Sequence, residues 1–274
     1  MRKKIFCFCA AGLFLISGCV SIKTVSYSLS SDKFIEGTSL GLILIADLHS
    51  TVYGENQRVL IEKIRSAAPD AILLAGDIVD DAAPIAGTRL LLEGVKDIAP
   101  LYYVTGNHEY MRKDFQEIMD ELRAYGVRVL SDEYERIEIR GNSITVAGVE
   151  DPYRGFLYEY HQEESMRKAF AALRNLKEYT ILIAHRPERI AEYTRYGFDL
   201  IVSGHAHGGQ VRIPPLINGL YAPDQGLFPK YAGGLYRHGG VSHIVSRGLS
   251  LTHPRLPRIF NPPELVYITV TSSD

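Results

Sequence analysis

Several uninterrupted apolar runs in this chain each end in a short polar cluster, and this repeated pattern constrains the fold more than any other feature. Apolar runs such as 40–46 and 71–75 are typical of strands that are buried on both faces. The clusters that close the runs are, in chain order, Asp47-Leu48-His49, Gly76-Asp77, Gly106-Asn107-His108-Glu109, His185 and Gly204-His205-Ala206-His207. We therefore expect polar side chains to gather at the ends of buried strands.

Helical segments between the first strands predict an α/β fold. Apolar residues recur at helical spacing over 56–67 and 85–98. Helical crossovers imply parallel strands, and ligands of such sheets bind beyond the carboxyl ends of the strands. The other expected elements are a helix over 115–125, a hairpin over 127–149 that turns at Gly141-Asn142, a helix over 163–176, and strands over 180–184, 199–203, 243–246 and 265–270.

The N-terminal segment has the layout of a bacterial export signal. Basic residues at positions 2–4 precede an apolar stretch over 5–16, which is shorter than the roughly 20 residues of a membrane-spanning helix. Ile16-Ser17-Gly18-Cys19 resembles the lipoprotein box, in which the chain is cut before the cysteine and the thiol is acylated. We expect a signal peptide over 1–18, lipidation of Cys19, and a place on the extracytoplasmic face of a bacterial cell membrane. An ordinary signal with a chance cysteine is the alternative.

The remaining composition predicts one domain behind a tether. Residues 19–38 are assigned to the lipid anchor and a polar, serine-rich tether, and residues 39–274 to a single domain without repeats. The three cysteines all precede residue 20, so disulfides and thiolate metal sites are excluded from the domain. The net charge is −2 and no cluster of Lys and Arg follows residue 4, which argues against a duplex nucleic-acid partner. No protein partner is inferred.

The clusters contain the oxygen and imidazole donors that divalent transition metals bind. Two ions about 3.5–4 Å apart can neutralise a phosphate and stabilise an in-line displacement. Such a pair needs a shared ligand, and Asp77 is the expected bridge because a carboxylate offers two oxygens. Asp47 and His49 stand two apart on an expected extended segment and would share one ion. His205 and His207 repeat that spacing.

The other polar residues near the clusters have less certain roles, and alternatives stay open for them. Asn107 would bind metal through its amide oxygen, and His108 would point elsewhere and act as an acid or charge stabiliser. Glu109 would orient a neighbouring histidine or begin a helix. Arg186 and Arg247 would contact a substrate phosphate or form surface salt bridges.

Residues 208–240 are rich in Gly, Pro and Tyr without a regular period, which predicts a rim loop beside the site. Its apolar residues would either contact an acyl chain or the bilayer, or pack the loop against the domain. These residues are Leu216, Ile217, Leu220, Tyr221, Leu227, Phe228 and Tyr231.

Taken together, the clusters closely resemble the motifs of the calcineurin-like metallophosphoesterases, over about residues 40–270. The resemblance implies two mixed β-sheets packed as a sandwich and flanked by helices. It also implies that His108 is a catalytic histidine that binds no metal. One ion would be held by Asp47, His49, Asp77 and His207, and the other by Asp77, Asn107, His185 and His205.

The segments 204–214, 246–248 and 260–265 are similar to a membrane-associated bacterial branch that includes UDP-diacylglucosamine pyrophosphatase-type enzymes. The expected export signal conflicts with that substrate, because a nucleotide-linked lipid precursor is made in the cytoplasm. We therefore expect the phosphoesterase chemistry of this branch but not its nucleotide-linked lipid substrate.

The predicted function is an exported, lipid-anchored phosphoesterase with two divalent ions, such as Mn, Fe or Zn, and a metal-bridging hydroxide. Its substrate would be a phosphorylated small molecule or lipid, with phosphodiester or pyrophosphate bonds favoured over monoesters. The alternative is a lipoprotein binding module that recognises a phosphorylated ligand without turnover.

Overall fold

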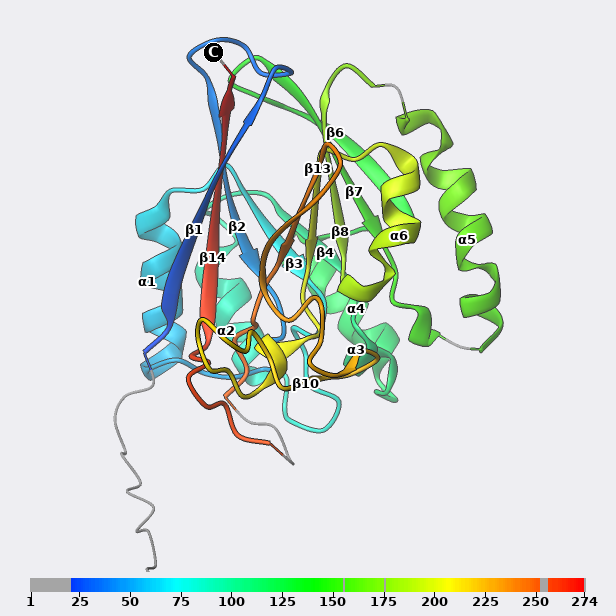
Figure 1. The fold of residues 1–274 in the computed structure, drawn as a ribbon. Coiled ribbons are helices and arrows are strands. Elements are labelled where there is room, and N and C mark those ends of the chain that lie inside the picture. Colours follow the sequence, from blue (N-terminus) through cyan, green and yellow to red (C-terminus); the bar gives the residue numbers. More distant parts are fainter. Residues whose placement is uncertain (1–20, 155, 175, 252–255, 274) are drawn as a thin grey trace, which may run out of the picture.

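The computed structural model describes residues 21–154, 156–174, 176–251 and 256–273 (Figure 1). The expected signal peptide over 1–18 and the expected lipidation site Cys19 lie outside the described residues. No helix within the described ranges is long and apolar enough to cross a membrane.

Two six-stranded sheets form the centre of the fold (Figure 1). The first sheet contains, in spatial order, β1 (Lys23–Ser31), β14 (Glu264–Ser272), β2 (Ser39–Ile45), β3 (Ala71–Ala75), β4 (Leu101–Val104) and β5 (Arg128–Val129). The second contains β12 (Gly234–His238), β13 (Val241–Val245), β9 (Leu200–Ser203), β8 (Tyr179–Ala184), β7 (Asn142–Val149) and β6 (Glu133–Ile139). A small ladder joins β10 (Tyr221–Ala222) to β11 (Gly226–Leu227).

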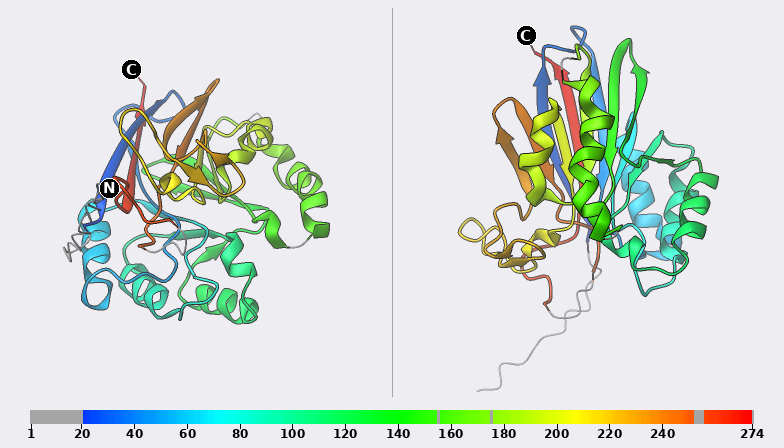
Figure 2. Two further views of the ribbon diagram at one scale, coloured as in Figure 1. Left: turned by 60° about the horizontal axis from the view of Figure 1, so that its bottom comes forward. Right: turned by 90° about the vertical axis from the view of Figure 1, so that its right-hand side faces the viewer.

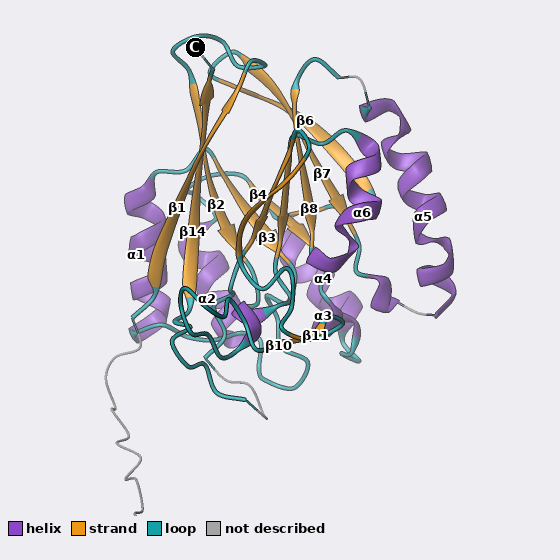
Figure 3. Ribbon diagram, viewed as in Figure 1, coloured by secondary structure: helices purple, strands orange, loops and turns teal. Residues whose placement is uncertain are grey.

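Helices cover the outer faces of both sheets (Figures 2 and 3). The helices are α1 (Arg58–Ala67), α2 (Ala86–Val95), α3 (Asn107–Tyr110), α4 (Phe115–Ala124), α5 (Phe156–Phe170) and α6 (Ile190–Tyr193). Short 3-10 turns lie at Glu55–Gln57, Pro152–Arg154, Ala171–Leu173, Pro187–Arg189, Thr194–Tyr196 and His207–Gly209. Apolar side chains of α1, α2 and α4 pack on the first sheet, and those of α5 and α6 pack on the second.

The central core lies between the two sheets, which confirms the predicted sandwich. In β2, Leu42 and Leu44 face this core, while Ile43 and Ile45 face the helices on the other side. Successive side chains of a strand point to opposite faces, so a strand covered on both faces needs an uninterrupted apolar run. The runs in the sequence reflect this double burial.

Parallel strands carry the polar clusters to one end of the molecule. β2, β3, β4 and β5 are parallel neighbours in the first sheet, and β7, β8, β9 and β13 are parallel neighbours in the second. The antiparallel hairpin of β6 and β7 is confirmed and lies at the edge of the second sheet. The loops after the parallel strands all face the lower end of the molecule in Figure 1.

The expected tether over residues 19–38 requires a correction. Residues 23–31 form β1, which pairs along its whole length with β14, and Phe34 is also buried. Val25, Tyr27 and Leu29 alternate with small polar residues, and Leu29 is only 4% exposed. Such an edge strand is solvated on one face, so its outward positions tolerate serine and threonine. The domain therefore begins before residue 39.

The expected rim loop also requires a correction in part. Within 208–240 the chain forms the β10–β11 ladder and then β12, which is the edge strand of the second sheet. Of the seven apolar residues considered there for lipid contact, Leu216, Leu227 and Phe228 are strongly exposed, whereas Tyr231 is buried.

Candidate metal centre

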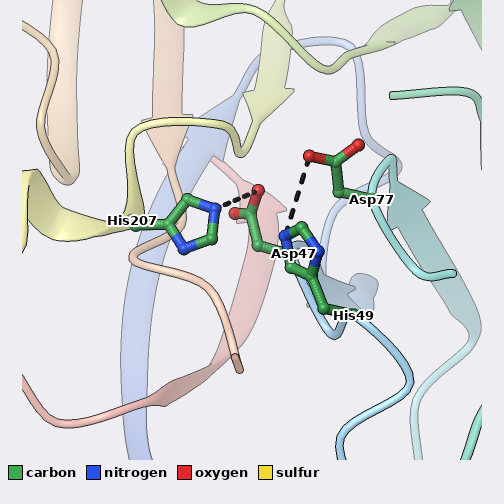
Figure 4. Close-up of side chains that lie close together, drawn as sticks. All are labelled: Asp47, His49, Asp77 and His207. Carbon is green, nitrogen blue, oxygen red and sulfur yellow. Dashed lines mark ion pairs between the residues drawn. The ribbon is translucent and has the colours of Figure 1, made fainter. Parts of the chain in front are cut away.

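Polar side chains from four strand ends converge in two groups. Asp47, His49, Asp77 and His207 form the first group, and Asp77, His185 and His205 form the second. Within each group, one potential ligand atom of every residue lies within 4.8 Å of the others. Figure 4 shows the first group, which joins loops that follow β2, β3 and β9. Asp77 belongs to both groups, which is the position that a bridging carboxylate requires.

Three buried polar atoms of the candidate ligands have no hydrogen-bond partner within the described structure. They are Oδ2 of Asp47, Nε2 of His49 and Oδ1 of Asn107. Buried polar atoms are nearly always paired, because an unpaired one loses its hydration without replacement. Oxygen and imidazole nitrogen atoms are also the donors that divalent transition metals take. The residues present therefore fit a pair of metal ions.

Hydrogen bonds orient two of the histidines toward the carboxylates. Nδ1 of His185 donates to the carbonyl oxygen of Ala75 at 2.8 Å, and its Nε2 lies 3.2 Å from Oδ2 of Asp77. His49 likewise directs Nδ1 to Asp80 at 3.2 Å, which leaves Nε2 facing Asp77 at 3.7 Å. Such partners fix the ring orientation of metal-binding histidines.

The electrostatics of the site are those of a buried, negatively charged pocket. Burial disfavours the charged form of His185, but the negative charge of Asp77 outweighs this effect and raises the pKa of His185 to about 10. Burial would raise the pKa of Asp77, yet the neighbouring histidines hold it well below its usual range. A divalent cation would take the place of the protons, and its binding would therefore release them.

The backbone at the candidate ligands is strained. Asp47, His49, Asp77, His205 and His207 all have left-handed φ values, between 46° and 66°. This conformation is costly for residues with a Cβ and is characteristic of functional sites. The expected extended segments are therefore wrong, and these five residues lie on tight turns instead.

Two close contacts show how tightly these turns pack. A Cβ at Gly76, where φ is 79°, would lie 2.5 Å from Nδ1 of His185 and 2.8 Å from the backbone nitrogen of Gly106.

His205 and His207 do not share a group, because His207 lies with Asp47 and His205 lies with His185. This division matches the one implied by the family motifs.

Glu109 supports the turn that carries Asp77. Its carboxylate is fully buried and accepts the backbone N–H groups of Gly106 at 2.8 Å, Val79 at 3.0 Å and Asp77 at 3.1 Å. Burial raises the pKa of this carboxyl group. Of the two roles considered, the helical one holds, because Glu109 lies in the first turn of the short helix α3 and joins it to the Asp77 turn.

His108 lies at the edge of the centre and is partly exposed to solvent. Its backbone N–H donates to Oδ1 of Asp77 at 2.9 Å, while its ring Nε2 lies 3.9 Å from Oδ2 of the same residue. Nδ1 of the ring lies 2.8 Å from Oδ1 of Asp81. Asp80 and Asp81, which sequence reasoning missed, follow Asp77 by three and four positions. Their place just after a strand-ending cluster was the available signal.

Arg186 and Arg247 are both engaged in ion pairs. Nε of Arg186 lies 2.7 Å from Asp151, and its Nη1 lies 2.5 Å from Asp224. Asp224 also accepts a hydrogen bond from Nε2 of His205 at 2.8 Å, and this bond together with the charge of Arg186 lowers the pKa of Asp224 to about 2. Arg247 pairs with Glu264 at 3.1 Å. Asp151 and Asp224 carry no local sequence signal for this network.

A cavity of about 610 Å³ opens over the two groups. Its walls combine site residues with apolar side chains from several loops. The lining residues are His49, Asp77, Asp80, Asp81, Ala82, Asn107, His108, Met111, Tyr153, Arg186, His205, His207, Gln210, Tyr221, Pro223 and Asp224. The arrangement offers space for a substrate between the candidate ligands and a partly apolar wall.

Comparison with known proteins places this geometry among its relatives. A sequence model described as calcineurin-like phosphoesterase matches residues 41–209. A metallophosphoesterase of Aquifex aeolicus (strain VF5) is 28% identical over 262 residues, which cover 91% of this chain and 92% of that protein. The protein YpbG of Bacillus subtilis (strain 168) is 30% identical over 196 residues, covering 70% of this chain and 69% of the relative.

The fold is also similar to a solved structure. GAP50, described as the anchor in the inner membrane complex of Plasmodium, superposes with a TM-score of 0.50 at 10% sequence identity. The match covers 77% of this chain and 73% of GAP50. At this identity the likeness concerns the fold alone.

Proposed function

The chain belongs to the calcineurin-like phosphoesterase family and is a metal-dependent phosphoesterase, and we propose that it hydrolyses phosphodiester or pyrophosphate bonds at the outer face of a bacterial cell membrane. The observation that carries the proposed chemistry is the convergence of two ligand groups on Asp77, with unpaired buried donor atoms on Asp47, His49 and Asn107. When bound there, a pair of divalent ions neutralises the charge of a phosphate and activates water for attack on phosphorus.

In this proposal His108 assists departure of the leaving group. Its Nδ1 is held by Asp81 at 2.8 Å, and the ring lines the cavity beside the candidate ligands. With Nδ1 held by the carboxylate of Asp81, the ring is oriented so that Nε2 can give a proton to the departing oxygen. A group that transfers protons in this way need not bind metal.

The charge of the cavity supports a phosphodiester over a monoester, and its size leaves room for the second substituent of a diester or a pyrophosphate. Arg186 is the one arginine or lysine among the described residues that line the cavity, and Asp151 and Asp224 already neutralise it. The extra negative charge of a monoester dianion would therefore find no free cationic side chain there. Tyr153 and Tyr221 provide a wall for a second substituent on the phosphorus.

Two variants and a control test the proposed chemistry. Asp77→Ala should lose metal loading, because the shared ligand of both groups is gone. His108→Ala should keep its metal and lose turnover by about 10²–10⁴-fold, the usual contribution of a general acid. His238→Ala, which removes a histidine outside the cavity, should behave as wild type. Metal content is measured by mass spectrometry, and hydrolysis of aryl phosphodiesters and phosphomonoesters is followed with manganese and with chelator.

The outcomes separate the enzyme from a binding module. Metal-dependent turnover that is lost in His108→Ala supports the proposal, and a higher rate on the diester supports the substrate class. If His108→Ala is as active as wild type, the catalytic assignment is wrong. A metal-loaded protein that binds phosphate esters but hydrolyses none would instead be a binding module.

The proposed membrane anchor depends on Cys19. The basic residues at 2–4, the apolar stretch over 5–16 and the sequence Ile16-Ser17-Gly18-Cys19 support export and acylation. Cys19→Ala should change the gel mobility and membrane fractionation of the protein in a bacterial host. Unchanged mobility and fractionation would contradict the lipid anchor.

A further inference from the structure

Large apolar side chains are strongly exposed on two loops beside the metal centre. Leu216 is 84% exposed, Phe260 74%, Leu227 68% and Phe228 64%. Soluble surfaces rarely concentrate such residues unless the surface meets a partner or a membrane. Together with Ile213, Tyr221 and Ile259, which are 40–47% exposed, we call these residues the apolar rim.

Backbone contacts join the two loops of the apolar rim into one surface. The N–H of Arg212 donates to the carbonyl of Ile259 at 3.0 Å, and Val211 forms a bridge with the same residue. Tyr221 and Leu227 are cross-strand partners in the β10–β11 ladder. The two loops thus lie side by side at one end of the molecule.

The apolar rim is also fixed to the metal centre. Nδ2 of Asn261, the neighbour of Phe260, donates to the backbone carbonyl of His207 at 2.8 Å. Tyr221 belongs both to the apolar rim and to the lining of the cavity. Whatever binds the apolar rim is therefore held at the mouth of the candidate active site.

The chain enters the domain at this same end. β1 runs parallel to β14, and β14 is antiparallel to β2. β1 therefore begins at the end of the sheet where β2 ends, which is the end that carries Asp47. The N–H of Lys23 donates to the carbonyl of Pro263 at 2.9 Å, three residues from Phe260. Figures 1 and 2 show the start of β1 at the end that carries the loops of 208–230 and 256–262.

The distance from Cys19 to the domain is short. Four peptide units separate Cys19 from Lys23, and they span at most about 15 Å. Because the expected tether is in fact the strand β1, an acyl chain on Cys19 would keep this end of the domain close to the bilayer. Exposed Lys23 and Lys230 add positive charge on the same side, which favours anionic headgroups.

We propose that the apolar rim inserts into the membrane interface, so that the cavity over the metal centre opens at the bilayer surface. The partner of this surface is a lipid bilayer, and the inference rests on the proposed lipid anchor at Cys19. Leucine and phenylalanine side chains on a folded surface gain by leaving water for the acyl boundary, while lysines stay among the headgroups.

The chain has no tryptophan, so single-tryptophan variants report on one position each. The variants are Leu216→Trp and Phe260→Trp in the apolar rim, and Ile35→Trp at the opposite end, where Ile35 is 53% exposed. Each acylated protein is loaded with manganese and reconstituted into phosphatidylethanolamine–phosphatidylglycerol vesicles. Tryptophan emission is recorded with and without doxyl-labelled lipid.

The two rim variants should shift their emission to the blue and be quenched several times more strongly than Ile35→Trp. Adding Leu227→Ser and Phe228→Ser to Phe260→Trp should reduce the quenching, whereas adding Ile35→Ser should not. Equal quenching of Phe260→Trp and Ile35→Trp would overturn the proposal.

Two parallel measurements distinguish this failure from failure of the proposed function. Hydrolysis of an aryl phosphodiester in the same samples reports on catalysis, and the mass of the mature protein reports on acylation of Cys19. If the protein is acylated and active but the tryptophan emission of the rim variants is not quenched, membrane docking of the apolar rim is refuted and the proposed function is not.

Discussion

Replacing Glu109 by alanine would remove the acceptor that holds the Asp77 turn. Three buried backbone N–H groups would lose their partner, and each such loss costs about 1–3 kcal/mol. The cost of burying the carboxylate itself is relieved at the same time, so we expect a net destabilisation of about 3–5 kcal/mol. For a domain of this size that corresponds to a melting temperature lower by roughly 10 °C. Metal affinity should also fall by about 10–100-fold, as for other residues that orient metal ligands.

The isosteric variant Glu109→Gln is the matched control. Its amide oxygen can still accept the N–H groups of Gly106 and Asp77, so only the bond from Val79 is lost and the cost should be about 1–2 kcal/mol. Thermal unfolding in chelator separates the effect on the fold from the effect on metal binding, which is then measured by manganese titration. The reasoning is refuted if Glu109→Ala melts within about 2 °C of wild type or no lower than Glu109→Gln.

Three other predictions test further features of the fold. Gly76→Ala should abolish metal loading, because its Cβ would lie 2.5 Å from His185. The control Gly126→Ala has nearly the same φ of 81° but open space around it, so it should lower the stability by only about 1–2 kcal/mol. Metal analysis and thermal unfolding of the two variants test this difference. Leu29→Ala should destabilise the protein by about 2–5 kcal/mol in denaturant unfolding, whereas a change within 0.5 kcal/mol, as at a surface position, would mean that this segment is a tether after all. Burial lowers the pKa of His243 from 6.5 to about 3, so the unfolded chain binds a proton there that the folded chain does not, and stability present above pH 6.5 is lost as the pH falls. In His243→Gln the free energy of unfolding should fall by about 1.4 kcal/mol less per pH unit than in wild type. The same pH dependence of the free energy of unfolding in both proteins between about pH 4 and 6.5 would contradict this.

The sequence predicted the layers of the fold because doubly buried strands leave a local signature. The runs that became β2, β3 and β8 are uninterrupted since one face meets the central core and the other meets helices. β1 escaped prediction because an edge strand has only one buried face. Its apolar residues alternate with serine and threonine, a pattern that also suits a polar tether.

The identity of the candidate ligands followed from residue type and position, but their conformation did not. Asp47 and His49 lie on left-handed turns, which contacts with the neighbouring strand end impose, since their N–H groups bond to Gly76 and Asp77. No local pattern reveals a backbone conformation that distant hydrogen bonds hold.

By itself the sequence determined which donor atoms the protein offers and in what order the strands deliver them. Burial periodicity and strand-ending clusters are local properties, so they can be recognised without knowing which segments pack together. The spacing of His205 and His207 did not separate them, although the family resemblance assigned them to different ions. Only the tertiary structure decided that Asp81 holds His108. It also decided that the start of β1 and the apolar rim lie at the same end as the metal centre. Those relations depend on how segments far apart in the chain pack, and packing is a property of the whole fold.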